Sequence, residues 1–169
     1  YDGDPWTSLA ELKVLGSFLS GSSAGAISSD AWSLLYTDSE ELVGEDGAAV
    51  NAFDGDPGTF WHTEWKASDP QHPHQLQVNL GGSYEINGFS VLARQDGGDN
   101  GRIRGFEFYV SSNGVDWGNP VATGTLADNA LEQTIAFEPV QGVYVRLVTL
   151  SAYDGDPWTS LAELKVLGS

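Results

Sequence analysis

An acidic loop at residues 51–61, with the sequence NAFDGDPGTFW, carries the residue types best suited to bind a metal ion. Asp54 and Asp56 are separated by a glycine, whose backbone freedom lets both carboxylates turn toward one point, and Thr59 adds a hydroxyl. Calcium takes about six to eight oxygen ligands in proteins, which is more than this loop offers. The loop is shorter than an EF-hand loop and lacks its closing glutamate, so a residue distant in the sequence must complete a calcium site. The alternative is a Pro-Gly turn with exposed acids.

Polar and aromatic residues in the predicted loops are of the types that bind a sugar. An aromatic ring packs against the apolar face of a sugar ring, and polar groups around it bind the hydroxyls. Trp65 and Trp158 have polar neighbours and are the predicted platforms, whereas Trp61 is predicted to lie in the core. The full set of candidates is His62, Glu64, Trp65, Arg94, Asp96, Asn100, Arg102 and Trp158. As alternatives, His62 forms a hydrogen bond within a loop and Arg94 with Asp96 forms a structural ion pair.

Catalysis and transition-metal binding are not predicted from this sequence. Glu64 lies among aromatic residues, but glycoside hydrolysis needs two carboxyl groups facing each other in a cleft, and no spacing in the chain indicates such a pair. The segment His72-Pro73-His74 has no clear third ligand for zinc, and we predict a turn before a strand there. The acidic residues between 38 and 46 are expected to form a solvated face.

Short apolar runs separated by glycine-rich turns indicate an all-β fold, a β-sandwich or jelly roll. Residues 75–80 alternate between polar and apolar side chains, as a half-buried strand does. The last predicted segment contains residues that also favour a helix, but its alternation and length suit a final strand. Residues 32–36 are expected to begin the packed unit, and the predicted strands are residues 75–80, 86–92, 105–111, 134–137, 143–148 and 160–167.

The chain is strongly acidic, with 24 Asp and Glu against seven Lys and Arg and a net charge of −17. This balance disfavours binding to nucleic acid or to an anionic membrane and suits a divalent cation. There is no cysteine, so no disulfide can stabilise the domain, and a bound metal is the expected substitute. No apolar run is long enough to insert into a membrane.

Residues 1–17, YDGDPWTSLAELKVLGS, recur letter for letter at 153–169. We interpret the first copy as the end of a preceding identical repeat, residues 18–31 as a Ser/Gly-rich linker and residues 32–169 as the domain. The chain is then part of a longer protein whose true start is missing; a cloning artefact is the other explanation. One body has one place for its last strand, so we expect the first copy to complete a neighbouring body. Alternatively, it lies on the surface of its own domain.

Several segments taken together resemble the discoidin family, the coagulation factor type C domain, whose bacterial relatives include the family 32 carbohydrate-binding modules. They are the acidic loop, followed by WHTEW at 61–65, QLQVNLG at 75–81, RQDG at 94–97, YVS at 109–111 and YVRL at 144–147. The resemblance covers about residues 32–169 in family order. It implies a discoidin-like jelly-roll β-sandwich with a structural calcium site. The implied ligands are the side chains of Asp54, Asp56, Thr59 and Glu163 and the carbonyls of Asn51 and Ala162, with Ala10 and Glu11 of the first copy as alternates.

The resemblance also implies a function. We expect a non-catalytic module, not an enzyme, that binds a glycan or polysaccharide, with galactose-type or uronic sugars as the candidates. The parent protein is expected to be secreted or on the cell surface of a bacterium. The alternative is a structural self-assembling repeat of an extracellular adhesin, stalk or filament, joined through residues 1–17.

Overall fold

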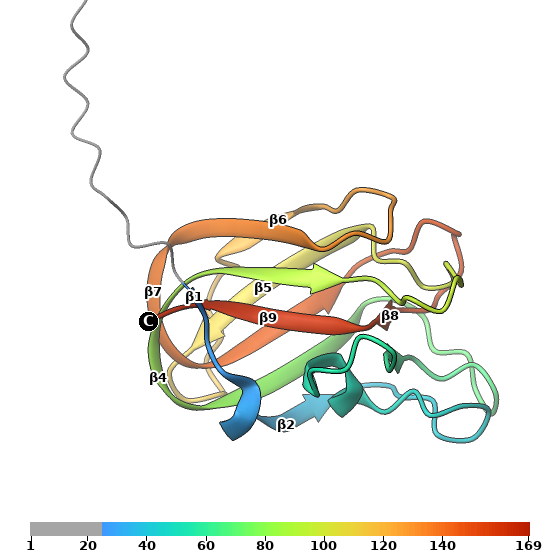
Figure 1. Cartoon of the computed structure of the whole chain (residues 1–169), viewed down its shortest axis with the longest axis horizontal. Helices are drawn as coiled ribbons and strands as arrows, with labels where there is room; N and C mark the ends of the chain where they lie inside the picture. Colours follow the sequence, from blue (N-terminus) through green and yellow to red (C-terminus); the bar gives the residue numbers. More distant parts are fainter. Residues whose placement is uncertain (1–24) are drawn as a thin grey trace, which may run out of the picture.

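Antiparallel strands dominate residues 25–169, the part of the chain that the computed structural model describes (Figure 1). Two short 3-10 helices accompany them, and no helix in this part is long and apolar enough to cross a membrane. The elements are β1 Gly25–Ala26, η1 Ser29–Ala31, β2 Ser33–Thr37, η2 Ala49–Phe53, β3 Trp61–His62, β4 His74–Leu92, β5 Gly105–Ser111, β6 Ala122–Thr125, β7 Gln133–Thr149, β8 Ser160–Leu161 and β9 Glu163–Gly168.

The main sheet has the order β1-β9-β4-β7-β5-β6, and β2 pairs with the first half of β4. The predicted strands 75–80 and 86–92 are the two halves of β4, just as 134–137 and 143–148 both lie in β7. The expected break at Gly81 is a bend, where the register shifts between Asn79 and Tyr84. Gly81 has a positive φ of 74°, and a Cβ there would lie 2.5 Å from the Ala31 carbonyl oxygen, so a side chain does not fit. The bent strands curl the sheet over its own core.

The core lies between the two halves of the curled sheet. Alternate residues of β4 point into it, and Leu76, Val78 and Leu80 are fully buried. Phe89 stacks on Phe108 of β5, with ring centroids 4.0 Å apart and planes 10° apart. Large aromatic rings supply much of the buried apolar area that stabilises a domain without disulfides. The prediction of an all-β sandwich is confirmed.

Trp61 is also buried in this core, as predicted, and its indole N–H donates to the carbonyl oxygen of Ser39 at 2.8 Å. The last predicted strand is present but divided. β8 pairs with β3 in a small second sheet, and β9 lies between β1 and β4 in the main sheet. Ala162 joins the two at the point where the chain changes sheets, and its N–H donates to the Leu92 carbonyl at 2.9 Å.

The predicted linker at residues 18–31 is wrong at its C-terminal end. Residues 25–26 form β1, which pairs with the end of β9, and residues 29–31 form η1. Ile27 is buried, and its N–H donates to the Val166 carbonyl at 2.9 Å, so an apolar side chain holds this segment on the body. The predictions for residues 1–17, including Ala10 and Glu11 as alternate calcium ligands, lie outside the described residues.

The acidic stretch at residues 38–46 is not simply a solvated face. Glu41 is fully buried, and its carboxylate accepts four backbone N–H bonds of 2.7–2.9 Å, from Val43, Gly44, Trp65 and Lys66. Burial opposes its ionisation, but these four donors outweigh burial and lower the pKa of Glu41 to about 2. Glu41 therefore ties the turn after it to the loop that carries Trp65.

Candidate functional site

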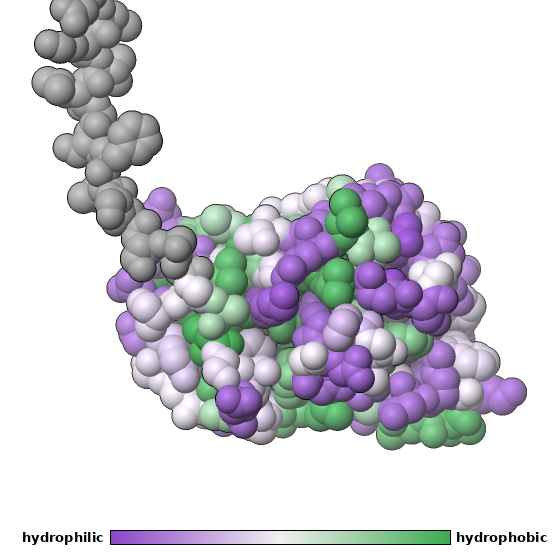
Figure 2. Space-filling view, viewed as in Figure 1, coloured by the Kyte–Doolittle hydropathy of each residue, from purple (hydrophilic) through white to green (hydrophobic). Residues whose placement is uncertain are grey.

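The loops that carry the predicted sugar ligands gather at the end of the sandwich opposite the C-terminus (Figure 1). Hydrophilic residues cover much of the face toward this end (Figure 2). A hollow of about 310 Å³ opens among these loops. It is lined by Glu45, His62, Trp65, Arg94, Asn100 and Trp158. Residues from four separate segments of the chain therefore form one site.

Five of the eight predicted sugar ligands line this hollow, and the other three do not. The Glu64 carboxylate accepts a hydrogen bond from the Ser68 hydroxyl at 2.5 Å. Asp96 pairs with Arg94 and so supports the hollow without lining it. Arg102 forms an ion pair of 2.8 Å with Asp128. Glu45 lines the hollow, although sequence reasoning did not select it.

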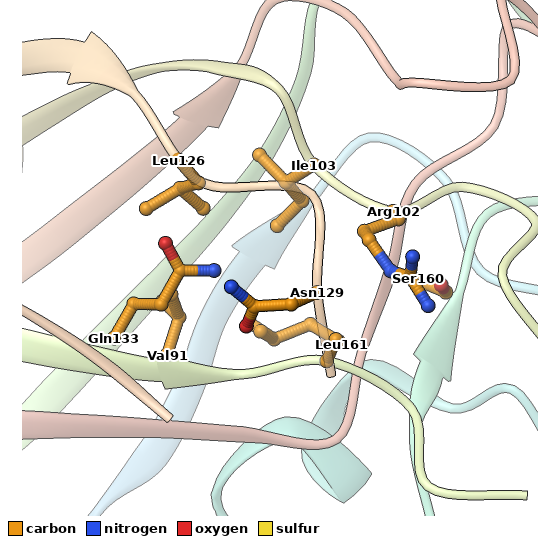
Figure 3. A pocket seen from close by; sticks show the side chains of 9 residues that line it. Val91, Arg102, Ile103, Leu126, Asn129, Gln133, Ser160 and Leu161 are labelled. Atoms are coloured by element: carbon orange, nitrogen blue, oxygen red, sulfur yellow. The ribbon is translucent and has the colours of Figure 1, made fainter. Parts of the chain in front are cut away.

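Arg102 instead borders a much smaller cavity (Figure 3). Its volume is about 10 Å³, which is enough for a water molecule and too small for a sugar. Figure 3 shows Asn129 and Gln133 beside Leu126 and Ile103 in this cavity, with Arg102 at one end. The cavity is therefore not a second sugar site.

Arg94 is fixed in the hollow by a bidentate ion pair. Its Nε donates to one carboxylate oxygen of Asp96 at 2.8 Å, and its Nη2 donates to the other at 2.5 Å. The guanidinium lies 4.2 Å from the centroid of the Phe60 ring, a cation–π contact. The Arg94 hydrogen bonds lower the pKa of Asp96 to about 2, so the pair stays ionised at neutral pH. Because the pair uses Nε and Nη2, the N–H groups of Nη1 have no partner in the described part of the chain and can donate to a ligand.

The two tryptophans at the hollow are each held by an acidic residue. The Trp65 indole N–H donates to Glu45 at 2.9 Å, and the Trp158 indole N–H donates to Asp69 at 2.6 Å. Trp65 also packs against Gly44, where a Cβ would lie 2.6 Å from the ring. Because their N–H groups are bonded to the protein, the indoles present their apolar surfaces in fixed positions, as a sugar platform requires.

One ring nitrogen of His62 forms a structural hydrogen bond, and the other has no hydrogen-bond partner within residues 25–169. The side chain is 2% exposed, and its ring centroid lies 6.1 Å from that of Trp158. Nδ1 lies 2.7 Å from the Thr63 carbonyl, which can only accept, so Nδ1 carries the proton and Nε2 is an acceptor. The predicted alternative, a hydrogen bond within the loop, thus describes one nitrogen and leaves the other for a ligand.

The acidic loop lies away from the hollow, against the start of β9. The Thr59 hydroxyl donates to Asp54 at 2.7 Å, and the backbone N–H of Asp56 donates to the same carboxylate at 2.8 Å. Asp56 accepts the N–H of Gly58 at 2.8 Å. The loop is therefore a chain of short, exposed turns in which the Thr59 hydroxyl lies beside the Asp54 carboxylate.

Glu163 at the start of β9 faces this loop. It is 6% exposed, and within the described part of the chain its Oε1 is buried without a hydrogen-bond partner. Burial, followed by the repulsion of the Asp54 carboxylate, raises the pKa of Glu163 to about 7. A buried carboxyl oxygen beside a second carboxylate is the environment that a divalent cation neutralises.

The predicted calcium ligands all offer oxygen atoms, which a cation needs, and two of them, Asp54 and Glu163, lie close together. Residues 25–169 contain no cluster of three or more His, Asp or Glu side chains placed to hold a metal. A cation between Asp54 and Glu163 would therefore need carbonyl and hydroxyl oxygens as well. Those are the groups assigned to Asn51, Ala162 and Thr59, and calcium accepts such oxygens readily.

The domain matches a known protein family. The family model of the F5/8 type C domain matches residues 36–164. The chain belongs to the F5/8 type C domain family. Its similarity to curated proteins supports the assignment. It is 39% identical over 145 residues to a sialidase of Micromonospora viridifaciens and 39% identical over 165 residues to a galactose oxidase of Gibberella zeae. These alignments cover 85% and 97% of the chain but 22% and 23% of those relatives, so the chain spans less than a quarter of their length.

Solved structures of carbohydrate-binding modules share the fold of this F5/8 type C domain. One is a family 32 module of Clostridium perfringens in complex with GalNAc-β-1,3-galactose, with a TM-score of 0.76 and 34% identity over 84% of this chain and 99% of that one. Another is the family 32 module of NanJ from the same organism, in complex with galactose. Its TM-score is 0.72, with 34% identity over 84% of this chain and 97% of that one.

Proposed function

We propose that this F5/8 type C domain is a non-catalytic module that binds a galactose-type sugar in the hollow at residues 62–65, 94–100 and 158. The observation that carries the proposal is the combination of two fixed indoles with a hydrogen-bond donor and an acceptor around one concavity. Arg94 Nη1 supplies donors and His62 Nε2 supplies an acceptor. A sugar hydroxyl both donates and accepts, so neighbouring hydroxyls satisfy both groups.

The nature of the sugar follows from the charge and from the relatives. Glu45 lines the hollow and the chain carries a net charge of −17, so a neutral sugar is favoured over an anionic uronic one. The two family 32 modules above were solved with galactose and with GalNAc-β-1,3-galactose. Both ligands contain galactose, which supports it as the sugar bound here.

Catalysis is not part of this proposal, because the acids near the hollow are already engaged. Glu45 accepts the Trp65 indole N–H and Glu64 accepts the Ser68 hydroxyl. Among the described residues, Glu45 is the one carboxylic acid that lines the hollow, whereas glycoside hydrolysis would need two carboxyl groups facing each other. The module would instead attach a larger secreted or cell-surface protein to its glycan, which fits the size of the curated relatives.

A binding titration tests the sugar site. We expect galactose to bind the wild-type protein, measured by calorimetry, and glucose to bind more weakly. Loss of a charged donor should cost Arg94→Ala about tenfold or more in affinity. Trp117→Ala, which changes a tryptophan outside the hollow, is the matched control and should bind as wild type does. Equal binding by Arg94→Ala and wild type would reject the proposed site.

Calcium is the proposed structural cofactor. Asp54, Asp56, Thr59 and Glu163 would supply side-chain oxygens, with carbonyls from Asn51 and Ala162. The orphaned Oε1 of Glu163 beside Asp54 supports this assignment. When bound, the ion would supply positive charge that offsets the repulsion between the two carboxylates and links the loop to β9.

The letter-for-letter repetition of 17 residues supports a second, compatible proposal. The domain would be one unit of a tandem array, as in an adhesin or filament, where several weak sugar sites gain avidity. Light scattering with calcium and with chelator, beside a chain without residues 1–17, tests whether copies associate through this segment. A monomer under every condition would count against association.

A further inference from the structure

His74, the first residue of β4, is a fully buried histidine that neither candidate site uses. Both of its ring nitrogens face oxygen atoms. Nδ1 lies 2.8 Å from a carboxylate oxygen of Asp38, and Nε2 lies 2.6 Å from the backbone carbonyl oxygen of Pro157. A carbonyl oxygen can only accept a hydrogen bond, so Nε2 carries a proton. If Asp38 is ionised, Nδ1 must carry a second proton, because two lone pairs would otherwise face each other.

The surroundings of the pair favour the ionised form of both partners. The second carboxylate oxygen of Asp38 accepts the backbone N–H of Gln75 at 2.6 Å, a bond that favours the charged carboxylate. Burial opposes a charge on His74, but the Asp38 carboxylate and the carbonyls of Pro157 and Pro70 outweigh burial and raise the pKa of His74 above its ordinary value of 6.5. His74 is therefore held as an imidazolium with two N–H donors.

A second histidine lies beside this imidazolium. The ring centroids of His72 and His74 are 4.9 Å apart, and His72 Nε2 lies 3.3 Å from the Thr159 hydroxyl. Burial, followed by the charge of His74, lowers the pKa of His72, whereas the charge of Asp154 acts in the opposite direction. Within residues 25–169, Asp38 and Asp154 are the charged side chains that act most strongly on these two histidines. His72 therefore stays neutral while His74 is charged.

The bond to Pro157 connects His74 to the sugar hollow. Pro157 directly precedes Trp158, whose indole forms one wall of the hollow. Residues 154–156 are exposed, so the loop before Pro157 has little packing to hold it. The His74 bond therefore anchors the backbone on the N-terminal side of the Trp158 indole.

We propose that His74 is a positioning residue of the sugar site, which holds the Trp158 loop in place only while both of its ring nitrogens carry protons. This proposal deepens the galactose-binding function proposed above and rests on it. As pH rises through the pKa of His74, one proton is lost. The Nδ1 proton remains, because a hydrogen bond to a carboxylate is roughly twice as strong as one to a neutral carbonyl. Nε2 then presents a lone pair to the Pro157 carbonyl oxygen, so the loop moves away and galactose binds more weakly.

Nitrogen NMR of the wild-type chain tests the protonation of His74 without any sugar. The chain has three histidines, so their ring signals are few and single substitutions assign them. We expect two protonated ring nitrogens on His74 at about pH 6, and loss of one proton with a midpoint above the ordinary pKa of 6.5. The Trp158 indole N–H signal, assigned with Trp158→Phe, should shift with the same midpoint. A His74 with one protonated nitrogen at about pH 6, or a Trp158 signal that is constant through the His74 transition, would overturn the proposal.

Calorimetric titration with galactose measures the effect on binding. We expect the wild-type Kd to rise about fivefold across the His74 transition, the effect of one lost hydrogen bond. Asp38→Asn should remove this pH dependence and keep the affinity of the low-pH state. The Gln75 N–H holds the amide oxygen, so the amide nitrogen donates to Nδ1, and a neutral His74 keeps its bond to Pro157. His72→Gln, which changes the neighbouring histidine, is the matched control and should keep the pH dependence.

The two measurements separate this proposal from the sugar-binding function. The same pH dependence of the Kd in Asp38→Asn and in wild type would overturn the role of His74, because the pH-sensitive group would then lie elsewhere, as at His62 in the hollow. Absence of galactose binding at every pH would reject the proposed function. The coupled transitions of His74 and Trp158 need no sugar, so they would still decide whether His74 positions the loop.

Discussion

Replacing Glu163 with glutamine should stabilise the calcium-free protein and destabilise the calcium-bound one relative to wild type. Without calcium, Glu163 ionises in a buried position beside Asp54, and its pKa of about 7 lies above the ordinary value of 4.5. A raised carboxyl pKa means that the folded state binds the proton more tightly than the unfolded state does. The free energy of unfolding therefore falls as pH rises from the unfolded pKa to the folded one, and stays low above it.

The size of this effect follows from the shift. Each pKa unit corresponds to about 1.4 kcal/mol, so the shift from 4.5 to about 7 sets an upper limit of about 3–4 kcal/mol. Glu163 is the first residue of β9 and faces the exposed loop at residues 54–56, and solvent screening through that loop reduces the expected penalty to about 2 kcal/mol. Glutamine cannot ionise, so Glu163→Gln without calcium should exceed wild type by about this amount at about pH 8 and equal it at about pH 4.

Calcium should reverse this order of stability, so that wild type becomes more stable than Glu163→Gln. Wild type gains stability from a ligand that binds only the folded state, whereas Glu163→Gln lacks a carboxylate ligand and should gain little. The assay is urea unfolding followed by tryptophan fluorescence, in chelator and in excess calcium, at both pH values. Glu138→Gln, on the exposed face of β7, is the matched control and should behave as wild type. Equal stabilisation of Glu163→Gln and wild type by calcium would refute the reasoning.

Three other substitutions give outcomes with distinct physical causes. Gly44→Ala should weaken galactose binding about tenfold, because the new Cβ would push the Trp65 indole out of place. The melting temperature should change little. Calorimetry measures the affinity, and an unchanged affinity would contradict this prediction. Glu41→Gln should lower the melting temperature, because four backbone N–H groups lose their charged acceptor. Since the pKa of Glu41 is lowered to about 2, the wild-type advantage in thermal melts should hold above about pH 4.5 and vanish as pH falls to about 2, and a pH-independent difference would argue against it. Phe108→Ala should cost about 3–5 kcal/mol in urea unfolding through loss of the stack on Phe89, and a cost under about 1 kcal/mol would show that the core collapses around the gap.

The strands were predictable because their burial follows the sequence alternation. In β4, the apolar residues Leu76, Val78 and Leu80 point inward. The polar residues between them are less buried, so the sequence alone shows the two-residue period of a strand. The extent of β4 was not predictable from the sequence, because Gly81 is equally suited to a turn that ends a strand and to a bend within one. The distinction depends on the Ala31 carbonyl, which approaches Gly81 from a segment far away in the sequence.

The candidate site was predictable in residue type and less so in position. Trp65 and Trp158 stood out as aromatic residues among polar neighbours, and both line the hollow. Glu45 and Glu41 were missed because they belong to an acidic run in which no local pattern separates a buried acid from a solvated one. Their roles arise from N–H groups that the fold brings to them, including the Trp65 indole and backbone N–H groups.

Calcium and sugar should act on different properties of this domain, although Glu163 and Trp158 lie five residues apart. The residues between them are held independently of any cation. The Thr159 N–H donates to the Thr63 hydroxyl at 2.9 Å, and the Ser160 hydroxyl donates to the Asn100 carbonyl at 2.7 Å. These buried bonds fix the backbone beside Trp158 and attach it to a loop that lines the hollow.

We therefore expect chelation to lower the melting temperature and to leave the galactose Kd within about twofold of its calcium-bound value, as long as the protein stays folded. Calorimetry well below the melting temperature, in calcium and in chelator, measures this. A tenfold or greater loss of affinity in chelator would mean that strain at Glu163 reaches Trp158 through Thr159 and Ser160. In that case the cation positions the sugar platform as well as stabilising the fold.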